Sequence, residues 1–116
     1  MCPQRILYLD NDAKRRSHLV LSMVSCAGPC IDARARISKA ELETGQYDYI
    51  FVHQGNEEES RALFKGLWDR HGAELILFSG GWPLEQFDQA SNGAYRVSAS
   101  MLQSSFAKVW ERVQKK

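Results

Sequence analysis

The residues of this chain best suited to chemistry follow apolar runs, and the first of them are acidic. Asp10, Asn11 and Asp12 come directly after the run ILYL, and His53 comes directly after the run YDYIFV. Two carboxylates on one loop can hold a hard cation such as Mg²⁺, and an imidazole with two carboxylates can bind a transition metal. Asp10, Asp12 and His53 are therefore candidate ligands of a divalent metal ion.

Two serines occupy similar places later in the chain. Ser79 follows the run ELILF, and Ser98 follows the short run AYRV. A serine hydroxyl can donate a hydrogen bond to an oxyanion. Because parallel strands present their carboxyl ends at one edge of a sheet, we expect both serines to lie near Asp10, Asp12 and His53.

The elements that must position these residues alternate as strand and helix, five times over. The strands are predicted at 5–9, 30–35, 47–52, 74–78 and 94–97. The helices are predicted at 13–27, at 39–44 with Ser38 as cap, from Asn56 to Gly72, from Pro83 with Leu84 and Phe87, and at the chain end with Leu102, Phe106, Val109 and Val113 as one apolar stripe. Right-handed crossovers place such helices on both faces of a parallel sheet. The short connections predict a single domain, 1–116.

Composition narrows the classes of function. The chain has 116 residues, of which 44% are hydrophobic and 25% charged, and its formal charge is only +1. We expect no nucleic-acid partner and no membrane partner, because there is no bulk positive field and no long apolar run. The first residues do not resemble a signal peptide, so a cytoplasmic location is expected. The three cysteines are odd in number, and reduced thiols at Cys26 and Cys30 are favoured over a disulfide framework or a zinc site.

One basic cluster opens the first helix. Lys14, Arg15 and Arg16, together with Arg34 and Arg36, could form a patch for nucleic acid. A solvated helix face is the favoured interpretation.

Several motifs match one family. The run ILYLDND resembles the first strand and acidic loop of response-regulator receiver domains, the CheY-like family, and YDYIFVH is similar to the third strand of that family. Ser79 matches the switch Ser/Thr of receivers, and Tyr95 matches their switch aromatic. The resemblance spans the whole chain and implies an α/β, flavodoxin-like fold: a doubly wound five-stranded parallel sheet, (βα)5, with strand order 2-1-3-4-5.

The chain departs from the receiver pattern at two positions that carry the phosphoryl chemistry. His53 stands where the resemblance places the phosphorylated aspartate, and Ser98 stands where it places a lysine. That chemistry needs a carboxylate nucleophile, a metal and the lysine. We therefore expect a pseudo-receiver that is not an enzyme. Its degenerate phosphorylation pocket would comprise Asp10, Asn11, Asp12, His53, Ser79 and Ser98.

Three interpretations of His53 remain open. In the favoured one the imidazole is structural, and its N–H bonds Asp10, Asp12 or a backbone carbonyl. In the second, His53 and the two acids bind a divalent metal, which is the only cofactor expected at all. In the third, the nearby acids favour the charged imidazole and make it a pH-sensitive contact.

The expected activity is binding to another protein in signal transduction, independent of phosphorylation. Tyr95, Trp82 and Arg96 are the candidate interface residues, since tryptophan, tyrosine and arginine dominate interface hot spots. For Trp82 a place in the core is an equal alternative. The resemblance implies a sensor kinase or an output domain as partner, and a homodimer through the final helix. The alternative function is a small-ligand or divalent-metal-binding flavodoxin-like module that uses the strand-end acids and His53.

Overall fold

Six strands form one sheet in this protein, for which a computed structural model describes residues 4–44, 46–56, 73–90 and 93–114. The strands are β1 Ile6–Leu9, β2 Ile31–Arg34, β3 Tyr49–His53, β4 Glu74–Ser79, β5 Phe87–Gln89 and β6 Tyr95–Ser98. Their order is β2-β1-β3-β4-β6-β5, and all neighbours are parallel except β5 and β6. The doubly wound α/β fold predicted from the sequence is confirmed.

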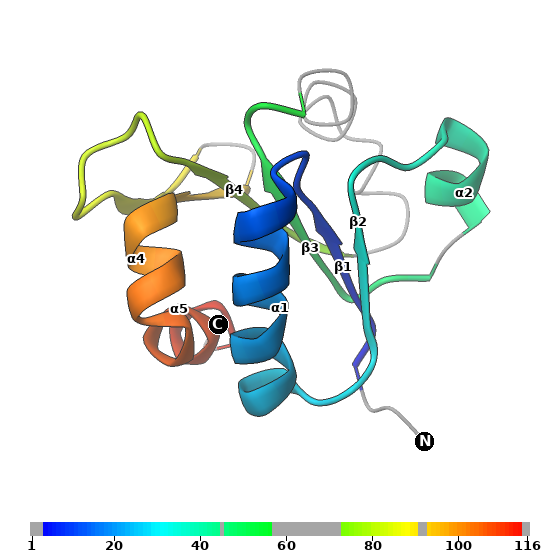
Figure 1. Cartoon of the computed structure of the whole chain (residues 1–116), viewed down its shortest axis with the longest axis horizontal. Coiled ribbons are helices and arrows are strands. Elements are labelled where there is room, and N and C mark those ends of the chain that lie inside the picture. Colours follow the sequence, from blue (N-terminus) through cyan, green and yellow to red (C-terminus); the bar gives the residue numbers. More distant parts are fainter. Residues whose placement is uncertain (1–3, 45, 57–72, 91–92, 115–116) are drawn as a thin grey trace.

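Four described helices accompany the sheet: α1 Ala13–Ala27, α2 Lys39–Thr44, α4 Ala99–Ser104 and α5 Phe106–Gln114. Helices α1, α4 and α5 lie together on one face of the sheet (Figure 1). Helix α1 begins at Asp12, whose side chain caps the N–H of Arg15, and it ends at Gly28 with a φ of 96°. The predicted cap of α2 is confirmed, because the Ser38 hydroxyl accepts the N–H of Glu41 at 3.1 Å.

The sheet has an apolar core on each face, because successive side chains of a strand point in opposite directions. One core joins the sheet to α1, α4 and α5, and its fully buried members include Tyr8, Phe51, Phe78, Leu19, Met23 and Leu102. The other face carries Leu7, Leu9, Ile50, Val52, Leu75 and Leu77. Runs of four to six mostly apolar residues are therefore strands covered on both faces, as in parallel sheets generally.

The predicted helix from Pro83 is wrong, and so is the strand count of five. Pro83 instead begins a turn, closed by a 2.9 Å hydrogen bond from the N–H of Gln86 to the Pro83 carbonyl. The next three residues form β5, antiparallel to β6, and the Phe87 ring packs edge-on against Tyr95. A strand spans the short connection between β4 and β6 with fewer residues than a covering helix would need. The fifth parallel strand is thus β6.

The predicted final helix is in two pieces. Helix α4 ends at Ser105, whose N–H bonds the carbonyl of Met101 at 2.8 Å, and α5 begins at the next residue. The predicted stripe is nonetheless correct, because Leu102, Phe106, Val109 and Val113 are all buried. The helix predicted from Asn56 to Gly72 lies outside the described residues.

Two further observations concern the chain as a whole. Cys30 is disulfide-bonded, whereas Cys26 is free and exposed, so the expectation of two reduced thiols is wrong for Cys30. Among the described residues, no helix has the length and apolar character needed to cross a bilayer.

Candidate functional site

The strand-end residues lie at one edge of the sheet, as the sequence predicts. Asp10 follows β1, and His53, Ser79 and Ser98 are the last residues of β3, β4 and β6, which are consecutive neighbours in the sheet. The register aligns His53 with Phe78, and Ser79 with Ser98. The topology therefore creates a single strand-end pocket.

Asp10 is completely buried and its carboxylate is fully hydrogen-bonded. Four donors reach it: the Tyr8 hydroxyl at 2.7 Å, the Asp12 N–H at 2.9 Å, and Nε and Nη2 of Arg15 at 2.6 and 2.8 Å. A carboxylate offers roughly four acceptor positions on its two oxygens. Each oxygen of Asp10 receives two of these donors, so the group is saturated by the protein itself.

The charge on this carboxylate is stabilised by those contacts. Burial by itself would raise the pKa of Asp10, but the hydrogen bonds from Arg15, the Asp12 N–H and Tyr8 outweigh it and hold the pKa below its ordinary value of 3.8. The hydrogen bonds from Arg15 to Asp10 also raise the pKa of the Arg15 guanidinium. Burial beside the carboxylate also raises the pKa of the Tyr8 hydroxyl. Asp10 and Arg15 are thus an ion pair over the whole ordinary pH range.

Arg15 is a site residue that was not predicted from the sequence. Its contacts contradict, for this residue, the interpretation of the basic cluster as a solvated helix face. Side chains on a helix lean toward its N-terminus, so a residue in the first turn of α1 can reach back to the end of β1. Only 17% of the Arg15 side chain is exposed. Arg16 is also engaged, because its Nη1 donates to the backbone carbonyl of Asp10 at 2.7 Å. Tyr8 and Arg15 would have been found by asking which long polar side chains can reach a buried acid.

His53 is structural in this geometry, but its hydrogen bond differs from the predicted one. Its Nδ1 accepts the backbone N–H of Gly55 at 3.0 Å, and its ring lies 5.2 Å from the Phe78 ring. Burial lowers the pKa of His53, the positive charge of Arg15 lowers it further, and the opposing effects of Asp10 and Asp12 are smaller. Both acids favour the charged imidazole, as expected, but burial and Arg15 outweigh them, so the pKa of His53 is lowered and not raised.

Two neighbours of His53 have roles that the sequence did not indicate. A Cβ on Gly55 would lie 2.7 Å from His53 Nδ1, so any larger residue there would require the His53 ring to move. Asn56 is buried and joins two loops: its Oδ1 accepts the N–H of Asn11 at 3.0 Å, and its Nδ2 donates to the Ala35 carbonyl at 2.6 Å. Asn11 itself is exposed. The loop after β3 is thus fitted to the loop after β1.

The two serines are buried and already bonded. The Ser79 hydroxyl accepts the N–H of Gly81 at 3.1 Å. The Ser98 hydroxyl donates to the Leu84 carbonyl at 2.8 Å and accepts the N–H of Met101 at 3.0 Å, so it caps α4 and holds the loop before β5. Ser98 therefore acts as a structural link at the position where receivers are expected to carry a lysine.

These residues do not fit a divalent cation. Asp10 has no acceptor position left, and His53 Nδ1 accepts a backbone N–H. Asp12 is exposed and caps α1 through Oδ1. Within the described part of the chain, no three His, Cys, Asp or Glu side chains are grouped so that they could hold a metal ion. The predicted ligand set of Asp10, Asp12 and His53 is thus not assembled.

The predicted interface residues are placed differently from one another. Trp82 is half-buried against the apolar core of the Leu7 face, which supports its interpretation as a core residue. Tyr95 is half-buried on Phe87, and Arg96 is exposed, with its Nε 2.7 Å from Asp88. Leu84, which the sequence did not single out, is 70% exposed at the turn before β5.

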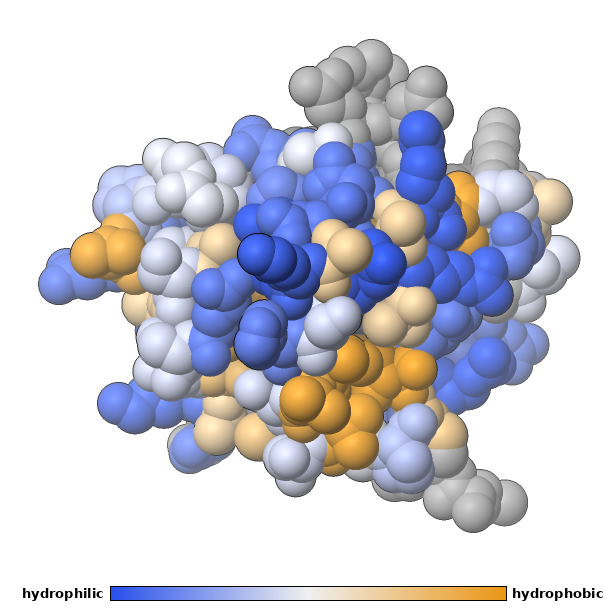
Figure 2. Space-filling model, in the orientation of Figure 1, coloured by the Kyte–Doolittle hydropathy of each residue, from blue (hydrophilic) through white to orange (hydrophobic). Residues whose placement is uncertain are grey.

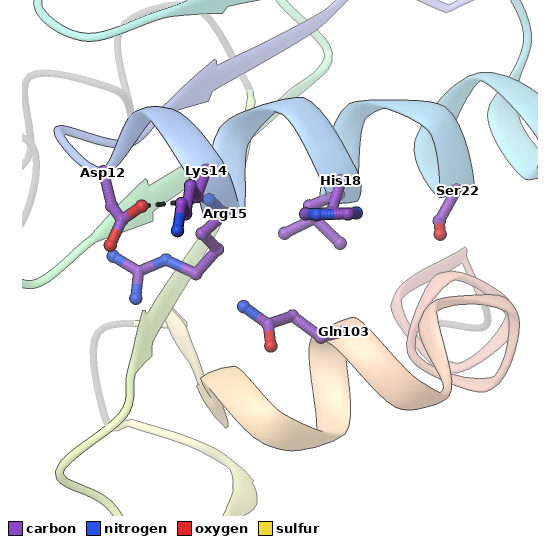
Figure 3. Close-up of a pocket in the computed structure, with 7 residues that line it drawn as sticks. Asp12, Lys14, Arg15, His18, Ser22 and Gln103 are labelled. Atoms are coloured by element: carbon purple, nitrogen blue, oxygen red, sulfur yellow. Dashed lines mark hydrogen bonds between the residues drawn. The ribbon is translucent and has the colours of Figure 1, made fainter.

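A groove of about 490 Å³ lies between α1 and α4. Figure 3 shows Lys14, His18 and Ser22 along α1, opposite Gln103 of α4, with Asp12 and Arg15 at one end. The groove shares Asp12 and Arg15 with the strand-end pocket, whereas His53 and the two serines do not line it.

A parallel sheet of order β2-β1-β3-β4-β6 with polar groups at its carboxyl ends is the flavodoxin-like fold of receiver domains. Solved structures match it: the receiver domain of the histidine kinase CKI1 from Arabidopsis thaliana, in a mutant form, has a TM-score of 0.70 and 16% identity, covering 99% of this chain and 92% of that one. The same receiver domain complexed with Mg²⁺ and BeF3⁻ has a TM-score of 0.66 and 16% identity, covering 97% and 91%. Searches of protein-family models and of characterised proteins found no match.

Proposed function

We propose that this chain is a receiver-fold signalling domain that acts by binding another protein without being phosphorylated. The observation that carries the proposal is the end of β3, where an imidazole stands in place of a carboxylate. Its Nδ1 is engaged with the N–H of Gly55. A strand-end pocket with no nucleophilic carboxylate at this position has no acceptor for aspartyl phosphorylation.

The state of Asp10 supports the same proposal. The receiver domain of CKI1 forms a complex with Mg²⁺ and BeF3⁻. In the present chain the buried Asp10 carboxylate is held by Arg15, Tyr8 and Asp12. No metal ion is therefore needed to balance the charge of Asp10. The proposed domain is a binding module and not an enzyme.

The proposed interaction surface consists of the turn before β5, strands β5 and β6, and α5. Leu84 projects from the turn, and Ser98 holds its backbone carbonyl. Behind it the Phe87 ring packs on Tyr95 and lies 4.0 Å below the Arg112 guanidinium. A rigid surface with one exposed leucine suits a partner that offers an apolar pocket, because pre-ordered side chains lose little entropy on binding.

Intact mass spectrometry tests the independence from phosphorylation. We expect no adduct after incubation with acetyl phosphate and Mg²⁺. A stoichiometric, acid-labile adduct would sink the proposal, and its position would identify the acceptor. The CKI1 receiver domain is a suitable reference for the same reaction conditions.

Binding is tested with a pair of matched leucine variants. Leu84 and Leu21 are similarly exposed, at 70% and 68%, but Leu21 lies on α1. Figure 2 shows an apolar patch at the second half of this helix. We expect Leu84→Ala and Tyr95→Ala to lose a partner captured from the native lysate, and Leu21→Ala to keep it. Loss in Leu21→Ala alone would move the interface to α1.

The kind of partner follows from the same proposal. A sensor kinase or an output domain is the partner class we propose, and a homodimer is the further possibility that light scattering after gel filtration measures directly. A dimer that Leu84→Ala dissociates would make a second copy the occupant of this surface. If the chain is a monomer, the proposed surface would bind a different protein.

A second candidate function is a small-ligand module. The groove between α1 and α4 favours it, since Lys14 and His18 line the α1 wall and Gln103 lines the α4 wall, and their side-chain nitrogens can donate hydrogen bonds into the same groove. An anionic ligand is the chemical class that these donors suit. Thermal shift with a panel of small anions and divalent metals tests this function, because a ligand specific for the folded state raises the melting temperature.

A cytoplasmic location also belongs to the proposal. The disulfide at Cys30 bears on this location, because cytosolic thiols are kept reduced whereas an oxidising compartment preserves disulfides. Alkylation of the protein in its native cells, followed by intact mass spectrometry, distinguishes the two. Alkylated Cys30 would support the cytoplasm.

A further inference from the structure

We propose that Arg15 takes the place of the divalent cation in this fold, so that the strand-end pocket carries its own internal counter-ion. The inference goes beyond partner binding, because it concerns how the pocket is kept in one state. The inference depends on the contacts of Asp10 and is independent of the partner that the domain binds.

The geometry of the pair is the first argument. Nε and Nη2 of Arg15 meet the two oxygens of Asp10 separately, at 2.6 and 2.8 Å. This fork-to-fork arrangement is the one in which a planar guanidinium fits a carboxylate best. A divalent ion would need the same oxygens, and Tyr8 and Asp12 already occupy their other positions.

The surroundings of the guanidinium are the second argument. Arg15 Cζ lies 6.0 Å from the centre of the Phe78 ring, and the neighbouring Arg16 is bonded to the Asp10 carbonyl. The Arg15 side chain is 17% exposed and Asp10 is not exposed at all. A cation that lies over an aromatic ring, is mostly buried and is paired is fixed in position, unlike the flexible arginine of a solvated helix face.

The two charges also explain why no ion from solution is required. A buried carboxylate with no counter-charge is costly, which is the usual reason why a cation enters such a pocket. Arg15 supplies that charge from within the chain. Removing the arginine should therefore leave Asp10 and Asp12 as oxygen ligands, and Mg²⁺ or Mn²⁺ prefers such ligands.

The test compares Mn²⁺ and Mg²⁺ binding in wild type and in Arg15→Gln by calorimetry and thermal shift. We expect wild type not to respond, and Arg15→Gln to bind Mn²⁺ at least about tenfold more tightly, with a rise in melting temperature. Arg16→Gln is the matched control, because Arg16 donates to the backbone carbonyl of Asp10 and not to its carboxylate. The double variant Arg15→Gln/Asp10→Asn should lose the gained response.

A measurement on wild type covers the case in which Arg15→Gln does not fold. Mn²⁺ should not selectively broaden the amide NMR signals of Asp10 and Asp12. Selective broadening there would overturn the inference, and so would an Arg15→Gln variant that folds and binds Mn²⁺ no better than wild type. Neither result depends on the acetyl phosphate or capture experiments, so failure of the proposed function would be recognised separately.

Discussion

Nδ1 of His53 accepts the backbone N–H of Gly55 at 3.0 Å. An imidazole nitrogen that accepts a hydrogen bond carries no proton, so this contact requires the neutral ring with its proton on Nε2. The imidazolium would present a second donor to the Gly55 N–H. The loop after β3 is thus built around uncharged His53.

His53 should make stability depend on pH. Burial and Arg15 lower its pKa below the ordinary 6.5, so the folded chain binds fewer protons than the unfolded chain just below that pH. The contribution is full above about pH 6.5 and is lost as the pH falls toward the lowered pKa. Urea unfolding at several pH values between about 5 and 7.5 measures the slope.

The pH effect has a close isosteric control. His53→Asn keeps an acceptor near Nδ1 and removes the titration, so the slope should become smaller than in wild type. His18→Asn, at an exposed position of α1, should leave the His53 contribution in place. Asp10 remains ionised over this range because its pKa is lowered from 3.8. An unchanged slope in His53→Asn would refute the assignment.

Gly55→Ala should displace the His53 ring. The new Cβ would lie 2.7 Å from Nδ1 and 2.9 Å from Cε1, inside ordinary contact distance. We expect a loss of about 1–3 kcal/mol in unfolding free energy, as for other overpacked sites. Gly80→Ala is the control, since a Cβ there meets nothing within 4 Å. Equal stability of the two variants would contradict the close fit.

Arg15→Met should be strongly destabilising, because it leaves the buried Asp10 without its counter-charge. Removing one partner of a buried ion pair costs about 3–5 kcal/mol, and we expect a loss in that range from denaturant unfolding. The variant Arg15→Met/Asp10→Asn should recover part of it. A loss as small as that of an exposed arginine would show that the pair is solvated.

Ser98→Ala should weaken both α4 and the turn before β5. The buried hydroxyl caps α4 and donates to the Leu84 carbonyl, so we expect a loss of about 1–2 kcal/mol. Hydrogen exchange should report faster opening at Met101. Ser100→Ala, an exposed change within α4, should have little effect.

Arg96→Ala should separate binding from stability. Its ion pair with Asp88 is exposed, and such pairs contribute less than about 1 kcal/mol. We expect nearly unchanged thermal unfolding and weakened capture of the partner. A large fall in melting temperature would remove Arg96 as an interface probe.

The sequence alone was sufficient for the positions of the five parallel strands along the chain. Apolar runs such as ILYL and YDYIFV are local signals, and strand ends in a parallel sheet share an edge for topological reasons. The positions of Asp10, His53, Ser79 and Ser98 followed from that. The presence of β5 in place of the predicted helix could not be predicted in this way, because it depends on the packing of Phe87 against Tyr95 in the neighbouring strand.

Only the tertiary structure decided what fills the pocket. In the sequence, Arg15 is one of three basic residues in the first turn of a helix. Its position predicts that the side chain leans toward the N-terminus of the helix, but it does not identify the group that the side chain contacts. The partner is decided by distance and burial, because a carboxylate removed from water must take the nearest donors. For Asp10 these are Arg15, Tyr8 and the Asp12 backbone, and for His53 the nearest is the Gly55 N–H. The residue types therefore predicted where the pocket lies, and the distances between the folded side chains determined its hydrogen bonds and charge.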